Sequence, residues 1–133
     1  MGDGGGRAGP IDLPSVVEEV EACFAAYDDA LLAGDIDALD QWLWASPKAI
    51  RFGLGEELYG AEAVAAYRRS APPLVRGPFT RHTVTTFGED LATVCAEFTD
   101  PGSIGRQTQT WLRTDEGWRI ASAHVSVRPT VER

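Results

Sequence analysis

The last third of the chain constrains its fold most, because it contains four strand-like runs separated by very short turns. The runs span residues 81–87, 91–99, 105–114 and 118–128. The breaks between them contain GED, DPGSI and DEG, which have the composition of turns. Runs joined by such short connections form antiparallel hairpins. We therefore predict a continuous antiparallel meander over residues 81–128.

Three helical segments precede this meander. In residues 12–34 apolar side chains recur at helical spacing, Pro14 suits the first turn and Gly34 suits a C-terminal cap. The apolar stripe consists of Val16, Val17, Val20, Cys23, Phe24, Tyr27, Leu31 and Leu32. A second helix is expected over residues 35–45 with Asp35 as its N-cap, and a third over residues 61–70. Two short strands, residues 49–53 and 57–60, are expected between them, joined by a tight turn.

This order of elements predicts an α+β fold with three helices packed on a curved, mostly antiparallel sheet. A strongly twisted sheet of this size curls over its helices and leaves a concave mouth, which is a natural site for a small molecule. We expect one domain over residues 14–130. The preceding residues 1–13 are rich in glycine and are expected to form a disordered tail.

Charge and composition exclude several classes of partner. Twelve basic and twenty acidic residues give a formal net charge of −8, which disfavours nucleic acid and anionic membrane surfaces. No apolar run reaches the roughly 18 residues of a membrane helix, and the N-terminus lacks the hydrophobic segment of a signal peptide. We therefore expect a cytoplasmic protein. Cys23 and Cys95 belong to no CxxC pair, and we interpret both as reduced thiols in the core.

Arg51 is the most informative single residue. It lies in AIRFG, residues 49–53, and in a strand it would face away from Ile50 and Phe52. Its neighbours on the same face, Ala49 and Gly53, are small, so a ligand could approach it closely. From spacing alone, Arg51 points either into solvent or into a pocket that binds an anion.

Other candidates carry similar alternatives. Tyr27 is either a core tyrosine or a proton donor whose hydroxyl enters the pocket. In GRQTQTWLR, the side chains of Gln107, Gln109 and Trp111 share one face, which fits a pocket wall, a subunit interface or an exposed sheet face. Arg68 lies at the end of the third helix, where a cation is favourable in any case.

His124 shares a strand face with Ser122 and Ser126 and is either a structural histidine or part of the pocket. The sequence has no HExxH motif, no paired histidines and no GxSxG elbow, so we expect neither a metal nor a serine triad.

A family resemblance runs through residues 16–127 and rests on five stretches. They are YDDALLAGDIDALDQWLW, AIRFGLGEELYGAEAVAAYR, TTFGEDLATVCAEF, GRQTQTW and GWRIASAHVS. Together they resemble the AtzH/HpxZ-like proteins of the SnoaL-like, nuclear-transport-factor-2-like superfamily. The resemblance implies a cone-shaped fold with an internal pocket, a homodimer, and a role near urea or oxalurate catabolism beside amidases.

One type of member decarboxylates 1,3-dicarboxyurea to allophanate without a cofactor. The resemblance implies that its essential tyrosine and arginine correspond to Tyr27 and Arg51, which we expect to be catalytic. We expect Trp44, Arg68, Gln109, Trp111 and His124 to bind the substrate, a small carboxylated amide or urea, with no cofactor and with an amidase as a potential partner.

The chain departs from the family in its third helix, where Arg-x-x-Arg is frequent and Ala71 takes the second position here. A smaller or less charged substrate would fit this change. Two alternatives remain at this stage: a protein that binds a ligand or an amidase without turnover, and an isomerase or cyclase that uses Glu97 or His124 as its acid or base.

Overall fold

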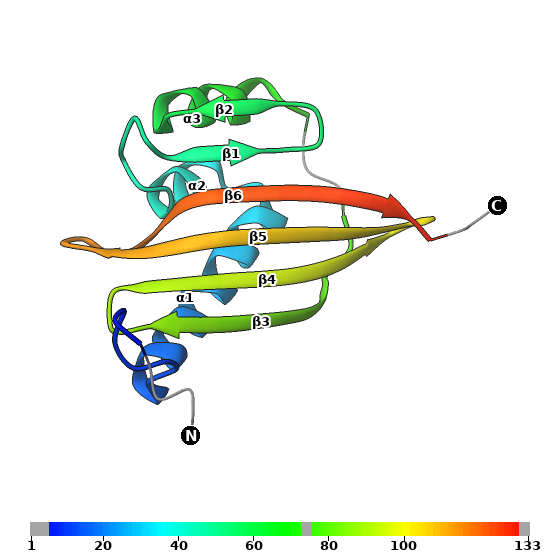
Figure 1. The fold of residues 1–133 in the computed structure, drawn as a ribbon. Helices are drawn as coiled ribbons and strands as arrows, with labels where there is room; N and C mark the ends of the chain where they lie inside the picture. The colour runs from blue at the N-terminus through cyan, green and yellow to red at the C-terminus, as the bar shows by residue number, and fades with distance from the viewer. Residues whose placement is uncertain (1–5, 73–75, 131–133) are drawn as a thin grey trace.

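The computed structural model describes residues 6–72 and 76–130, which form a six-stranded sheet with helices on one face (Figure 1). The helices are α1 (Pro14–Ala33), α2 (Ile36–Trp42) and α3 (Ala61–Ser70). The strands are β1 (Ile50–Phe52), β2 (Glu57–Tyr59), β3 (Phe79–Phe87), β4 (Leu91–Asp100), β5 (Ser103–Thr114) and β6 (Gly117–Pro129). The predicted α+β fold is confirmed.

The predicted meander is present, and each of its four strands is slightly longer than the sequence suggested. β3 pairs with β4, β4 with β5 and β5 with β6, all antiparallel. Because side chains alternate across the pleat, even-numbered positions of β3 from His82 onward and of β4, and odd-numbered positions up to Trp111 in β5, face the helices. We call this the inner face and the opposite one the outer face.

The strand order β2-β1-β6-β5-β4-β3 contains one pairing that the sequence did not indicate. β1 lies parallel to β6, with Arg51 opposite Ala123. β2 then pairs antiparallel with β1 and forms the edge of the sheet. In Figure 1 this short β1–β2 ribbon and α3 form one end of the molecule.

The helix boundaries follow from local signals. Gly34 ends α1 in the left-handed conformation, at φ 68°, and its N–H reaches the carbonyls of Ala30 and Leu31. The Asp35 side chain accepts a hydrogen bond of 3.1 Å from the Ala38 N–H, which confirms the predicted N-cap.

The core lies between α1, α2 and the inner face. Its buried residues are Val16, Val20, Phe24, Tyr27, Ala30, Leu39, Val84, Ala92, Val94, Ala96, Trp111, Trp118 and Ile120. A smaller cluster of Leu43, Ala49 and Val64 packs α3 against the β1–β2 hairpin. Leu32, predicted on the apolar stripe of α1, is instead 51% exposed because it lies beside the end of the helix.

Two expectations about the rest of the chain are wrong in part. Cys95 is a free thiol as expected, but it is exposed on the outer face, because its register places it beside Thr83 and Thr108. The tail was predicted to be disordered over residues 1–13, whereas residues 6–13 are placed. The Asp12 N–H donates to the Thr86 carbonyl at 3.0 Å, and the Asp12 carboxylate accepts the Thr86 N–H at 2.9 Å. Residues 1–5 lie outside the described residues.

Gly105 on β5 is required by the aromatic ring opposite it. A Cβ at this position would lie 2.1 Å from the Phe98 ring, which is itself buried against Phe79. We therefore expect Gly105→Ala to lower the free energy of unfolding by about 1–3 kcal/mol, as overpacking does. Denaturant unfolding checks this. Gly55→Ala is the control, since a Cβ there meets nothing within 4 Å; equal stability of the two variants would contradict the packing explanation.

Candidate functional site

The pleat brings Arg51 and Gln109 into one row on the inner face. Arg51 lies opposite Ala123 in β6, and Ala123 lies opposite Gln109 in β5. Two strand spacings separate Arg51 from Gln109, about 10 Å between their backbones. Only the methyl group of Ala123 stands between them in this row. Arg51 thus lies on the inner face of the sheet, and whether it binds a ligand there stays a prediction.

Gln109 is fixed in orientation by Trp111. The indole Nε1 donates a hydrogen bond of 2.9 Å to the Gln109 Oε1, and both side chains are fully buried. An indole can only donate, so the amide oxygen must face it and the amide nitrogen must face the other way. That Nε2 has no hydrogen-bond partner among the described residues. A buried, unsatisfied N–H₂ group is costly and therefore marks a place for an acceptor.

Arg68 supplies a second unsatisfied donor. It lies in the last turn of α3, its side chain is 12% exposed, and its Nη1 makes no hydrogen bond within the part of the chain described. The nearest carboxylate oxygen, Oδ1 of Asp40, is 4.0 Å away. The other oxygen of Asp40 accepts a hydrogen bond of 2.6 Å from Arg69. Asp40 therefore attracts Arg68 electrostatically but accepts no hydrogen bond from it, so the Nη1 group of Arg68 keeps its donors.

Tyr27 lies beside these donors. It comes from α1, is 2% exposed, and its ring meets the Trp111 ring edge-on at 6.3 Å between centroids. Burial lowers the pKa of Arg68, Tyr27 and Asp40 raise it, and the positive charge of Arg51 lowers it further. Tyr27, Arg51 and Asp40 are therefore all close enough to Arg68 to influence its pKa.

Arg51 has a partner that the sequence reading missed. Its Nη1 donates to Oε2 of Glu56 at 2.8 Å, with the two side chains 22% and 18% exposed. Glu56 follows the tight turn, and its Oε1 also accepts from the Gly55 N–H at 3.2 Å. A carboxylate five residues after the arginine, across a Gly-x-Gly turn, was the available signal. Tyr67 of α3 borders this pair: partial burial raises its pKa first, and the charge of Glu56 raises it further.

We use the name inner chamber for this cluster of residues: Tyr27, Arg51, Glu56, Arg68, Gln109 and Trp111. Its donors outnumber its acceptors, since two unsatisfied N–H groups and the remaining N–H groups of Arg51 are accompanied by one carboxylate, Glu56, that is already paired. Outside this cluster, the unsatisfied Oδ1 of Asp40 lies 4.0 Å from Arg68 Nη1. Such a lining fits a ligand with carboxylate or carbonyl oxygens. Among residues 6–72 and 76–130 no group of three His, Cys, Asp or Glu side chains could hold a metal ion.

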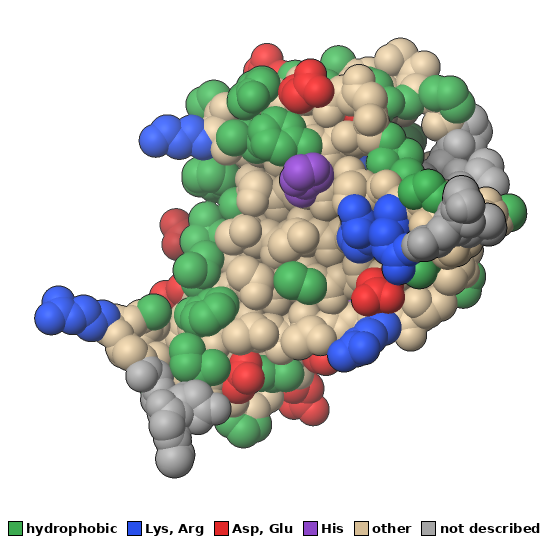
Figure 2. Space-filling view, turned by 45° about the vertical axis from the view of Figure 1, so that its right-hand side comes forward, with side chains coloured by type: hydrophobic (Ala, Val, Ile, Leu, Met, Phe, Trp, Pro, Cys, Tyr) green, Lys and Arg blue, Asp and Glu red, His purple; other side chains and the backbone are tan. Residues whose placement is uncertain are grey.

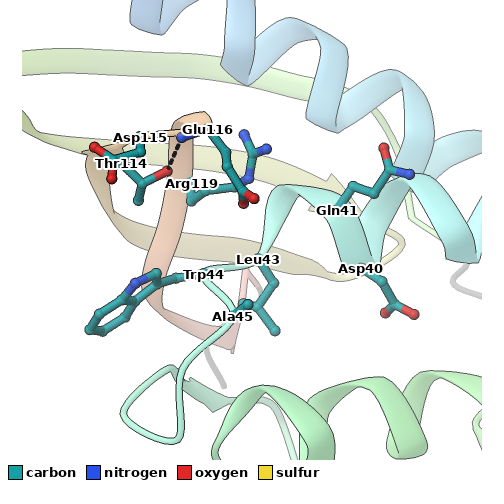
Figure 3. Close-up of a pocket in the computed structure, with 9 residues that line it drawn as sticks. All are labelled: Asp40, Gln41, Leu43, Trp44, Ala45, Thr114, Asp115, Glu116 and Arg119. Atoms are coloured by element: carbon teal, nitrogen blue, oxygen red, sulfur yellow. Dashed lines mark hydrogen bonds between the residues drawn. The ribbon is translucent and has the colours of Figure 1, made fainter.

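Two of the residues expected to bind substrate lie elsewhere. His124 is exposed on the outer face, where its ring stacks edge-on against Phe52 at 5.6 Å. Trp44 lines a separate cavity of about 450 Å³ between the end of α2 and the β5–β6 hairpin, together with Arg119 and Glu116 (Figure 3). In Figure 3 the Trp44 ring and the Asp40 carboxylate lie at opposite ends of this cavity.

The acid–base candidates of the isomerase alternative also fall outside the chamber. Glu97 is exposed on the outer face opposite Arg106, and His124 shares that face. A second cavity, of about 240 Å³, lies between α1 and β3 and is lined by Phe24, Asp28, Phe79 and His82, among others. Neither of these two cavities is lined by a residue of the inner chamber.

Comparisons with known proteins agree with this architecture. A family model described as AtzH-like matches residues 9–130. A crystal structure of a protein of unknown function from Pectobacterium atrosepticum is 41% identical, with a TM-score of 0.84, covering 89% of this chain and 94% of that one. A cystatin-like fold protein from Burkholderia xenovorans is 39% identical, with a TM-score of 0.87, covering 91% and 98%.

A more distant structure, an NTF2-like protein of unknown function from Pseudomonas putida, shares the fold at 16% identity. Its TM-score is 0.72, and the match covers 90% of this chain and 97% of that one. The cone-shaped, nuclear-transport-factor-2-like fold expected from the sequence is thereby confirmed. Curated protein sequences gave no match. No helix in the described part of the chain is long and apolar enough to cross a membrane.

Two largely buried arginines, Arg68 and Arg76, differ in how their charge is compensated. Arg76 is almost fully buried, is paired with Asp28 and lies over the Phe79 ring at 4.1 Å, whereas Arg68 is buried without a close partner. We expect Arg76→Met to destabilise the protein by about 3 kcal/mol, because it leaves Asp28 unpaired. Arg68→Met should stay within about 1 kcal/mol of the wild type or exceed it, because the only ion pair of Arg68 among the described residues is at 4.0 Å and its partner Asp40 keeps the hydrogen bond from Arg69.

Thermal and denaturant unfolding of both variants check this difference. A loss of stability in Arg68→Met as large as that in Arg76→Met would mean that Arg68 is a structural residue.

Proposed function

The chain belongs to the AtzH-like family, and we propose that it is a cofactor-free decarboxylase of a small N-carboxylated, urea-type compound. The observation that carries this proposal is the pair of buried, unsatisfied donors, Gln109 Nε2 and Arg68 Nη1, beside Tyr27. Most buried polar groups in folded proteins have a partner within the protein, and these two donors have none among the described residues. They are left for the oxygens of a ligand.

The proposed substrate is held by its carboxylate and carbonyl oxygens. Arg68 and Gln109 offer N–H donors to one end, and Arg51 offers its free N–H groups to the carbonyl next to the nitrogen that carries the departing carboxylate. In a site walled by Trp111 and Tyr27 these charge-assisted bonds are stronger than in water. The chain carries a net charge of −8, so attraction of an anion is local to the arginines rather than a property of the whole surface.

Bond cleavage then needs one proton. The bond between the nitrogen and the carboxylate carbon breaks, carbon dioxide leaves, and the electron pair stays on the nitrogen. The Tyr27 hydroxyl donates its proton to that nitrogen and regains one from water after the product has left. Arg51 stabilises the negative charge that spreads onto the neighbouring carbonyl oxygen during cleavage. The reaction consumes one proton and needs neither oxidant nor reductant.

The chemistry implies a supplier for the substrate. N-carboxylated ureas arise when an amidase hydrolyses a larger carboxylated amide, so an amidase is the partner that we propose upstream. We also propose that the chain acts as a homodimer that uses its outer face. Figure 2 shows that the centre of this face consists mainly of uncharged polar side chains and backbone. Phe52 and His124 lie on it, next to the exposed Tyr59.

Turnover is the direct test of the decarboxylase. Carbon dioxide release would be followed from 1,3-dicarboxyurea, generated in situ by an amidase acting on a carboxybiuret, and from singly N-carboxylated urea. We expect the protein to accelerate at least one of the two reactions. Tyr27→Phe should lower the rate by roughly 10²-fold or more through loss of the proton donor. Arg51→Ala should lower it by a similar factor.

The control is Tyr59→Phe, which removes a hydroxyl from an exposed tyrosine outside the chamber. Release at the uncatalysed rate from both compounds would overturn the proposal. Binding of the same compounds without acceleration would identify the chain as a binding protein.

The assembly has its own test. Sedimentation or light scattering should give twice the 14.3 kDa mass of the chain. Thr108→Asp places a charge at an exposed position in the middle of the outer face and should shift the protein towards the monomer. Thr80→Asp, exposed near the end of β3, is the control. A wild-type protein that is monomeric at all concentrations would overturn the dimer.

A further inference from the structure

Glu56 changes the charge that the inner chamber offers to a ligand. The cations in and next to the chamber are Arg51, Arg68 and Arg69, and the anions among the same neighbours are Glu56 and Asp40. Asp40 is engaged by Arg69 at 2.6 Å, and Glu56 is engaged by Arg51 at 2.8 Å. Arg68 is therefore left as the single cation with no carboxylate closer than 4.0 Å.

The Arg51–Glu56 pair is built into the hairpin rather than formed by chance at the surface. A Cβ at Gly53 would lie 1.8 Å from Glu56 Oε2 and 2.8 Å from Arg51 Nη1, so a larger residue there would displace the ends of these two side chains. The Gly53 N–H also donates to the Glu56 carbonyl at 3.0 Å, and the Gly55 N–H holds the second carboxylate oxygen. Backbone and side chain together fix Glu56 against Arg51.

We propose that Glu56 makes the inner chamber selective for a singly charged ligand, with one carboxylate at one end and an amide-type N–H at the other. This inference rests on the proposed function in that it takes the chamber as the ligand site. The carboxylate pairs with Arg68 and the Gln109 amide. At the other end, the carbonyl oxygen accepts from Arg51 and the N–H donates to Glu56.

The selectivity follows from the two charges at that other end. An amide or urea presents an acceptor and a donor side by side, which matches the N–H groups of Arg51 and the carboxylate of Glu56. A second carboxylate in the same place would present two acceptors and a negative charge to Glu56, and like charges at close range are strongly unfavourable. The chamber thus suits the singly N-carboxylated urea, allophanate, better than 1,3-dicarboxyurea. Ala71, which replaces a family arginine, is consistent with a less charged ligand.

Stable analogues test this without any turnover. Malonamate carries one carboxylate and one amide, malonate carries two carboxylates, and malonamide carries none. Binding of each to the full-length wild-type chain would be measured by calorimetry near neutral pH. We expect malonamate to bind at least roughly tenfold more tightly than malonate, and malonamide to bind more weakly than malonamate because it lacks the charge for Arg68.

Variants of the hairpin separate charge from position. Glu56→Gln keeps the size and removes the charge, and it should reduce the preference for malonamate over malonate to less than about threefold. Gly53→Ala keeps the charge but displaces the carboxylate, and it should weaken the preference in the same direction. Glu57→Gln is the matched control: the residue is adjacent, acidic and exposed, and we expect the wild-type preference to be unchanged.

The outcomes are distinct from those of the turnover experiment. Tighter binding of malonate than of malonamate by the wild type, no binding of either anion, or an unchanged preference in Glu56→Gln would each overturn this inference. A selective chamber that shows no carbon dioxide release would leave the selectivity standing and overturn only the decarboxylase.

Discussion

The parallel pairing of β1 with β6 is the constraint on which the rest of the site depends. It sets Arg51 opposite Ala123, on the face that α1 and α2 cover, and in the same row as Gln109. A shift of this register by one residue would turn Arg51 to the outer face and Phe52 into the chamber. The same pairing carries the β1–β2 turn with it, so that Glu56 reaches Arg51 only because β1 is held in this position.

Buried polar groups in this protein divide into two kinds. Arg76 is paired with Asp28 and covered by Phe79 and Phe98, so its burial is compensated within the fold. Arg68 and Gln109 keep donors that the described residues leave unsatisfied. The net free energy of unfolding of a protein is small, so unsatisfied buried donors cost a noticeable part of it. We infer that such donors are kept here because a ligand satisfies them. The Trp111 indole contributes to this difference: it donates to the Gln109 amide oxygen and so turns the amide nitrogen away from itself, where it has no partner among the described residues.

Faces of strands were the least certain part of the sequence reading. Alternation correctly grouped Gln107, Gln109 and Trp111 on one side of a strand, and the structure puts that side against the helices. The same alternation could not decide the side for Cys95, Glu97 and His124, which all lie on the outer face. Period-two patterns state which residues share a face, but the side that is covered depends on where the helices pack. The position of Trp44 could not be predicted for a related reason: it follows α2, and it faces the cavity beside the β5–β6 hairpin and not the inner chamber.

By itself the sequence determined the local elements and the antiparallel meander, because turn composition, capping residues and hydrophobic periodicity act over a few neighbouring positions. Through the family resemblance it also predicted that Tyr27 and Arg51 act together as catalytic residues. Only the tertiary structure decided that Arg51 faces inward, that Glu56 neutralises it and that Arg68 remains without a close counter-ion. The Arg51–Glu56 contact lies within one hairpin, but the inward direction of Arg51 and the surroundings of Arg68 depend on contacts between segments that are far apart in the chain. They come from sheet register and from the packing of α3, which follow from the burial of the whole core.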